Sequence, residues 1–88
     1  MKPYKEEVNE YYFIREFSDD VTQDELVWHR DLKDRKIEVL EGRGWKFQID
    51  NSLPFNIIPG DHLTVKAKEY HRLIKGDTLL KLRITEKL

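Results

Sequence analysis

Three side chains of the kinds that bind metals or move protons stand out in the sequence. His29 and Asp31 are separated by one residue, and His71 follows much later in the chain. Side chains two residues apart in a strand share a face, so His29 and Asp31 can point together into one interior. With a distant histidine they would supply two imidazoles and a carboxylate, a set that holds iron(II) and leaves positions open for oxygen and substrate. His29, Asp31 and His71 could supply such a set of metal ligands.

Other interpretations of these three residues stay open. Nitrogen and oxygen ligands alone do not select the metal, so a divalent iron, manganese, zinc or nickel ion would suit the set. A metal-free enzyme is also possible, with His29 or His71 as a catalytic general base that Asp31 orients. The ordinary alternative is that His29 and Asp31 lie at a strand end, in solvent or accepting turn amides, and that His71 is half-buried.

Arg35 and Gln48 are the residues that we assign to substrate binding. If the strand register holds from Asp31 onward, Arg35 points inward beside the site, where an unpaired guanidinium would be costly. Its partner could be Asp31, which would weaken metal binding, or the carboxylate or phosphate of a small ligand. A loop over residues 32–34 could instead turn Arg35 to solvent. The sequence therefore favours a small-molecule ligand inside the fold, and an anionic one if Arg35 binds it.

The elements that position these residues are expected to be strands. Short apolar-rich runs alternate with clusters of turn-forming residues, and no long stretch has helical periodicity. Leu80, Leu82 and Ile84 alternate with polar residues, as in a strand with one buried face. The runs cover residues 11–17, 25–30, 36–41, 45–50, 54–58, 62–67, 70–74 and 79–85. About eight short strands predict an all-β sandwich or barrel over residues 11–88, behind an N-terminal arm over residues 1–10; a small SH3-like or OB barrel is the alternative.

The segment around the first histidine resembles the first motif of the cupin superfamily. That motif has two histidines separated by one residue, a glutamate four residues later and a strand that ends in Val-Leu-x-Gly. This chain has His29-Arg30-Asp31, then Arg35, then Val39-Leu40-Glu41-Gly42. Asp31 thus stands where the second histidine is usual, and Arg35 stands where the glutamate is usual.

A later segment is similar to the second cupin motif, a Pro-Gly-Asp turn, a strand and an Ile-Pro-Ala-Gly-x-x-His stretch. Here the turn is Pro59-Gly60-Asp61 and the stretch runs from Val65 to His71, with Lys66 and Lys68 in place of the proline and glycine. The resemblance covers roughly half the chain. It implies a single cupin-type jelly-roll barrel of about eight strands, in which His71 occupies the position of the last metal ligand.

Composition limits the partners of the chain. The 16 basic and 17 acidic residues give a formal net charge of -1, so no overall field attracts nucleic acid or a membrane surface. The chain has no cysteine, which excludes disulfides and thiol nucleophiles and agrees with a reducing compartment. No apolar run approaches membrane-spanning length. We expect a cytoplasmic protein with no nucleic acid or membrane partner.

The second predicted strand also suggests a partner chain. If His29 faces inward, Leu26 and Trp28 would face outward on the same strand, and an exposed Trp-Leu pair needs a covering surface. We therefore expect a homodimer, which resembles common cupin assembly.

Overall fold

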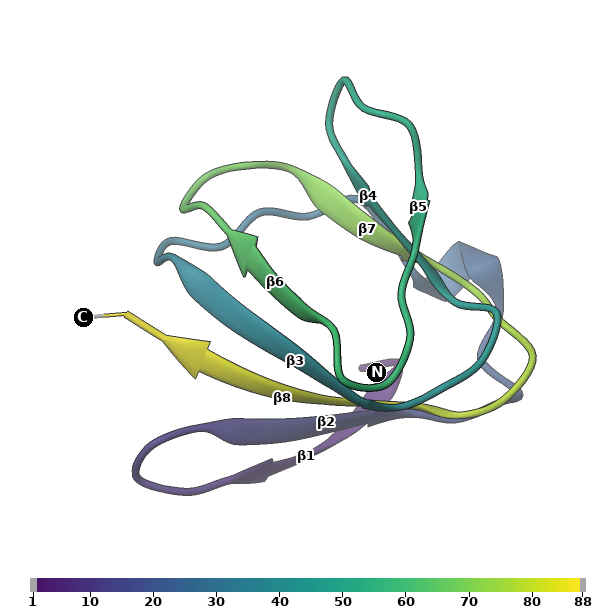
Figure 1. The fold of residues 1–88 in the computed structure, drawn as a ribbon, viewed down its shortest axis with the longest axis horizontal. Helices are drawn as coiled ribbons and strands as arrows, with labels where there is room; N and C mark the ends of the chain where they lie inside the picture. The colour runs from purple at the N-terminus through teal and green to yellow at the C-terminus, as the bar shows by residue number, and fades with distance from the viewer. Residues whose placement is uncertain (1, 88) are drawn as a thin grey trace.

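The computed structural model describes residues 2–87, so Met1 and Leu88, which belong to the predicted arm and barrel, lie outside it. Within this range, two antiparallel sheets face each other, one with the order β1-β2-β8-β3-β6 and the other with the order β5-β4-β7 (Figure 1). The elements are β1 (Tyr4–Val8), β2 (Phe13–Phe17), the 3-10 turn η1 (Gln23–Glu25), β3 (Arg35–Glu41), β4 (Lys46–Ile49), β5 (Phe55–Asn56), β6 (His62–Val65), β7 (His71–Ile74) and β8 (Leu80–Glu86). The predicted all-β jelly roll is confirmed.

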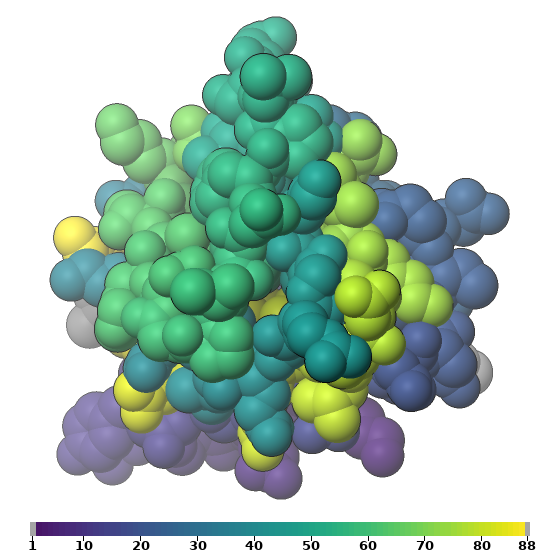
Figure 2. All heavy atoms as spheres, turned by 45° about the vertical axis from the view of Figure 1, so that its right-hand side comes forward, coloured from purple at the N-terminus to yellow at the C-terminus, as the bar shows by residue number. Residues whose placement is uncertain are grey.

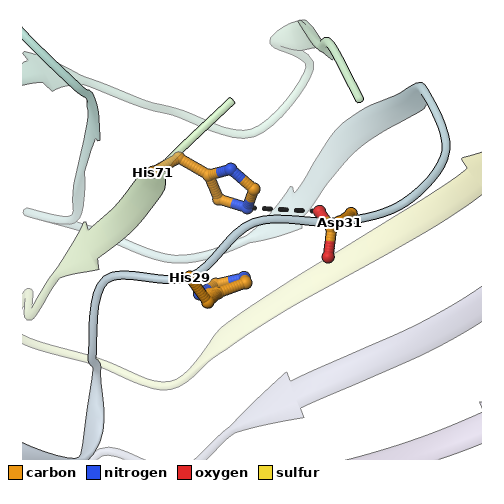
Figure 3. A group of neighbouring side chains, drawn as sticks. All are labelled: His29, Asp31 and His71. Atoms are coloured by element: carbon orange, nitrogen blue, oxygen red, sulfur yellow. Dashed lines mark ion pairs between the residues drawn. The ribbon is translucent and has the colours of Figure 1, made fainter. Parts of the chain in front are cut away.

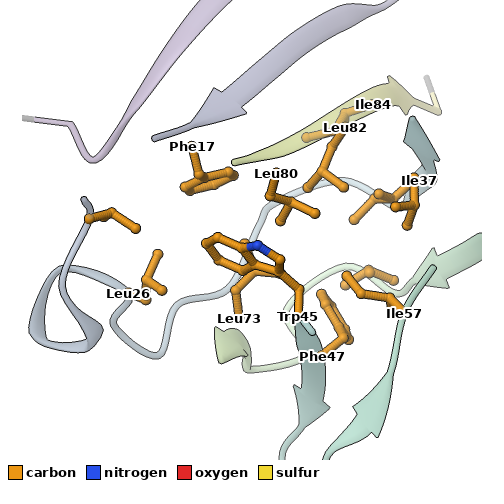
Figure 4. Packing of buried hydrophobic residues seen from close by; sticks show 13 residues of the cluster. Phe17, Leu26, Ile37, Trp45, Phe47, Ile57, Leu73, Leu80, Leu82 and Ile84 are labelled. Carbon is orange, nitrogen blue, oxygen red and sulfur yellow. The ribbon is translucent and has the colours of Figure 1, made fainter. Parts of the chain in front are cut away.

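The core lies between the two sheets and follows from the alternation in β8. Leu80, Leu82 and Ile84 are buried. Their partners across the larger sheet are Phe17, Val39 and Ile37 in that order. Trp45 lies fully buried between the sheets, near Phe17 on one side and Leu73 on the other (Figure 4). The Trp45 indole N–H donates a 2.8 Å hydrogen bond to the Thr78 carbonyl, so the ring is buried without an unpaired polar atom.

The N-terminal residues form part of the sheet, which differs from the predicted arm over residues 1–10. Tyr4 to Val8 pair with β2 along their whole length, from Tyr4 opposite Phe17 to Val8 opposite Phe13. Asn9 closes this hairpin, because its side-chain oxygen accepts the backbone N–H groups of Tyr11 and Tyr12. The sequence concealed this strand because its outer positions are mostly charged, as at many sheet edges.

The prediction of a strand over residues 25–30 is wrong. Thr22 and Glu25 form a capping box that starts η1, and the chain then turns so that Leu26 is buried in the core. Trp28 is 39% exposed, with the Arg72 guanidinium 4.7 Å from its ring centre. The expected outward Leu26–Trp28 pair therefore does not exist, and the homodimer that it suggested stays a prediction.

The Pro59-Gly60-Asp61 turn is confirmed. The Asp61 N–H donates to the Ile58 carbonyl at 3.0 Å, and Gly60 has a φ of +95°, which matches a type II turn with proline and glycine at its centre. The neighbouring β4–β5 hairpin projects from the body of the molecule (Figures 1 and 2). Between residues 2 and 87 there is no helix with the length and apolarity needed to cross a membrane.

Candidate metal centre

The backbone brings His29 and His71 side by side. His71 is the first residue of β7, and it exchanges two backbone hydrogen bonds of 3.0 and 2.9 Å with His29 in the extended segment after η1. The two ring centres are 4.3 Å apart (Figure 3). His71 is 4% exposed, whereas His29 is exposed. The predicted pairing of these distant histidines is therefore present in the fold.

Both imidazole rings are held in the same tautomer. Nδ1 of His71 lies 2.9 Å from the Glu69 carbonyl oxygen, and Nδ1 of His29 lies 3.1 Å from the Val27 carbonyl oxygen. A carbonyl oxygen only accepts hydrogen bonds, so each Nδ1 must carry the hydrogen. In a neutral ring, Nε2 then carries a lone pair. Metal-binding histidines typically have this arrangement, in which one nitrogen donates to a carbonyl and the other binds the ion.

Asp31 faces one of these lone pairs. Its Oδ2 lies 3.3 Å from Nε2 of His71, and it is the one buried side-chain polar atom without a hydrogen-bond partner among the described residues (Figure 3). Burial lowers the pKa of His71, which favours the neutral ring. Two acceptors therefore face each other across a short gap. A cation between them would satisfy both, and buried polar atoms are rarely left unpaired.

The donor set fits a divalent ion. His29, Asp31 and His71 each offer one ligand atom, and these atoms lie within 4.8 Å of one another. An ion with bonds of about 2.1 Å holds its ligand atoms roughly 3 to 4 Å apart, so a pair at the 4.8 Å limit needs to close by about 1 to 2 Å. The exposed ring of His29 has room for such a shift.

Arg35 points inward and pairs with Asp31. Its NH1 group lies 3.2 Å from Asp31 Oδ1, and its Nε donates to Glu86 Oε2 at 3.2 Å. The side chain is 13% exposed, which excludes the alternative that a loop turns it to solvent. Arg35 thus occupies one oxygen of Asp31 and leaves the other toward His71. Glu86 was not predicted, although it lies directly opposite Arg35 in the β3–β8 register.

Gln48, assigned to substrate binding from the sequence, lies elsewhere. It pairs across the smaller sheet with Arg72, whose Nε donates to its side-chain oxygen at 2.9 Å. Its neighbours Phe47 and Ile49 face the core, and Ile49 lies opposite His71. Because successive side chains in a strand alternate, Gln48 lies on the other face of the sheet from the histidine. That assignment is corrected.

Sequence reasoning missed Arg15, a charged residue on the inner face. In β2 it lies between Phe13 and Phe17 in the alternation, and its partner across the sheet is the buried Leu82. Arg15 lines a pocket of about 350 Å³ that also includes His29 and Asp31. The signal was present in the sequence, because Phe13, Arg15 and Phe17 share one strand face and the outer two are aromatic.

Comparison of the whole chain with known proteins finds similarity in structure alone. No protein-family model and no curated protein sequence matches it. A cupin superfamily protein of Desulfitobacterium hafniense is 23% identical at a TM-score of 0.67, over 91% of this chain and 71% of that one. A cupin domain of Bordetella pertussis is 14% identical at a TM-score of 0.64, over 97% and 92%. The DMSP lyase DddQ of Ruegeria pomeroyi is 12% identical at a TM-score of 0.70, over 88% of this chain and 37% of that one.

Proposed function

We propose, from the cupin fold that this chain shares with those structures, that it binds a divalent metal ion and holds a small anionic molecule beside it. The ligands of the ion would be Nε2 of His29, Nε2 of His71 and Oδ2 of Asp31. The observation that supports this proposal is the pair of facing acceptors, His71 Nε2 and Asp31 Oδ2, at 3.3 Å. Such an ion would act as a Lewis acid on a bound oxygen atom.

The surrounding residues of the chain orient the ligands. The carbonyls of Val27 and Glu69 fix the two rings with Nε2 toward the site. The ring of Phe47 is stacked on His71, with centres 5.5 Å apart and an angle of 18° between the planes. Arg35 holds Asp31 through its other oxygen. Ligands held in this way lose little freedom when an ion binds, because their rotamers are already selected.

A metal-free general base is less well supported by the same geometry. In a His-Asp pair that moves protons, the carboxylate accepts the N–H of the imidazole and orients the ring. Here the His71 hydrogen is on Nδ1 and is donated to Glu69, so the neutral ring offers Asp31 no N–H. The carboxylate would orient the ring only after protonation, which burial of His71 opposes. A metal-free binding module remains the alternative that the experiment must exclude.

Elemental analysis tests the proposal on protein purified without a metal-affinity tag. We expect about one equivalent of a divalent metal, or stoichiometric uptake of added cobalt(II) with the visible absorption of a nitrogen- and oxygen-ligated ion. His71→Ala should lose the ion. His62→Ala is the matched control, because His62 is exposed on β6 and should leave binding unchanged. A native protein that contains no metal and takes up none contradicts the proposal.

A further inference from the structure

We infer that Arg15 recognises the carboxylate of a small molecule whose apolar part lies in the mouth of the barrel beside the metal centre. The position next to an ion rests on the proposed function. Recognition of the carboxylate by Arg15 does not, because it depends on the guanidinium alone.

Arg15 is positioned before any ligand arrives. Its Nε donates to Glu6 Oε2 at 2.6 Å, and the guanidinium carbon lies 4.2 Å from the centre of the Tyr4 ring and 5.1 Å from that of Phe13. Glu6 is the one polar partner that the described residues give this guanidinium. A guanidinium presents five N–H groups in a planar fork, so its two terminal amino groups remain available. A carboxylate matches that fork with two parallel hydrogen bonds.

The available space places the ligand at the mouth of the barrel, whereas the sequence predicts a ligand site in the barrel interior. The interior cavity that Arg15 shares with His71 and Leu82 has a volume of about 40 Å³, enough for a water molecule and little more. The pocket that Arg15 lines together with His29 and Asp31, here called the outer pocket, has a volume of about 350 Å³, which is within the range of small-molecule sites. It lies between the start of the chain and the segment after η1, so the residues once expected to be an arm form one wall.

The lining of the outer pocket indicates the class of ligand. Two of its residues, Arg15 and Lys2, are cationic, and Tyr4, Phe17, Leu26 and Leu73 offer apolar surface. Glu6 already neutralises part of the charge on Arg15, and the lining also includes Glu25 and Asp31, of which Asp31 is paired with Arg35. This balance suits a single carboxylate with an aliphatic or aromatic tail better than a doubly charged phosphate.

Isothermal titration calorimetry with butyrate tests the inference, with butyramide and inorganic phosphate as companion probes. Butyrate should bind the metal-free protein more tightly than neutral butyramide or phosphate. Arg15→Gln should weaken butyrate binding by roughly ten- to a hundredfold, the effect of losing hydrogen bonds to a charged group. Glu6→Gln should strengthen it, because the negative charge that partly neutralises the Arg15 guanidinium is removed. A merely structural ion pair would not move the two variants in opposite directions.

Matched controls separate this inference from the metal proposal. Arg83→Gln removes an arginine that is also paired with a glutamate, Glu38, but lies on the outer face of the sheet, so butyrate binding should not change. Cobalt(II) uptake should be equal in the wild type and in Arg15→Gln. If Arg15→Gln does not fold, Arg15→Lys keeps the charge without the fork and should still bind less well. Equal binding of butyrate and butyramide, preference for phosphate, or unchanged affinity in the folded Arg15 variant would overturn the inference.

Discussion

Asp31 Oδ2 and His71 Nε2 lie 3.3 Å apart without a hydrogen between them while His71 is neutral. The Nδ1 hydrogen of His71 is already donated to the Glu69 carbonyl, and burial lowers the pKa of the ring. The gap between the two atoms can therefore be filled by a metal ion or by a second proton on the imidazole. Competition between the two connects metal binding with pH and with stability.

The metal-free protein should lose stability as the pH falls below about 6.5, the ordinary pKa of histidine. Because the folded-state pKa of His71 is lowered, the unfolded chain binds a proton there first, and the free energy of unfolding decreases as the pH falls. Above both pKa values this contribution is constant. Urea unfolding in EDTA at pH 8, 6.5 and 5.5 measures the free energy of unfolding at each pH. His71→Gln should reduce its dependence on pH, whereas His62→Gln should not. Stability that rises on acidification would mean that the ion pair with Asp31 outweighs burial.

Arg35→Glu should increase metal affinity at least about tenfold, because it replaces a cation beside the ion with a further carboxylate ligand. The metal-free variant should be less stable than the wild type, since the introduced carboxylate would face both Asp31 and Glu86. Lys36→Glu makes the same change of charge at the adjacent exposed position and should have little effect. Competition with a chromophoric chelator gives the dissociation constants. Equal affinity in the two variants would show that Arg35 does not limit the site.

Much of this arrangement could be predicted from the residue pattern. The alternation of Leu80, Leu82 and Ile84 identified the buried face, and the two motifs placed His29 and His71 together. These features depend on period-two patterning and turn chemistry, which are local. The inward position of Arg35 was one of several open alternatives, because the path of residues 32–34 depends on contacts with a distant loop. Asp34 accepts the Ala67 N–H at 2.7 Å, and the Lys68 N–H donates to the Asp31 carbonyl at 2.7 Å.

The errors have a different physical origin. The composition of the segment from Glu25 to Arg30 favours a strand, but the Thr22–Glu25 capping box starts a 3-10 turn there, and Leu26 is buried in the core. The parity of β4 places Gln48 on the face of the sheet opposite the site, because its neighbour Phe47 is in the core. Arg15 was overlooked because an inward arginine needs a partner, and Glu6 lies on a strand that the sequence did not reveal.

Lys68→Gly should stabilise the protein by about 0.5 to 1 kcal/mol. Lys68 has a φ of +65°, a left-handed conformation that disfavours side chains with a Cβ, and it stands where the cupin motif has glycine. Lys66→Gly is the control, because the backbone of Lys66 does not have a positive φ and the added flexibility should destabilise the fold. Thermal unfolding of the two variants measures the difference. Destabilisation by both changes would show that the Lys68 side chain contributes more than its backbone strain costs.

Gly76→Ala should destabilise the protein by about 3 kcal/mol, at the upper end of the cost of overpacking. A Cβ at this position would lie 2.5 Å from both the Arg43 carbonyl oxygen and the Trp45 nitrogen, and these backbone atoms cannot move aside as a flexible side chain would. Gly60→Ala isolates the conformational cost, because its Cβ would meet no atom within 4 Å while its φ of +95° disfavours alanine. Gly60→Ala should lower the free energy of unfolding by about 1 kcal/mol. In a domain of this size the Gly76 variant should therefore melt more than about 10 °C below the wild type. A loss equal to that of Gly60→Ala would mean that the β7–β8 turn can move away from Trp45.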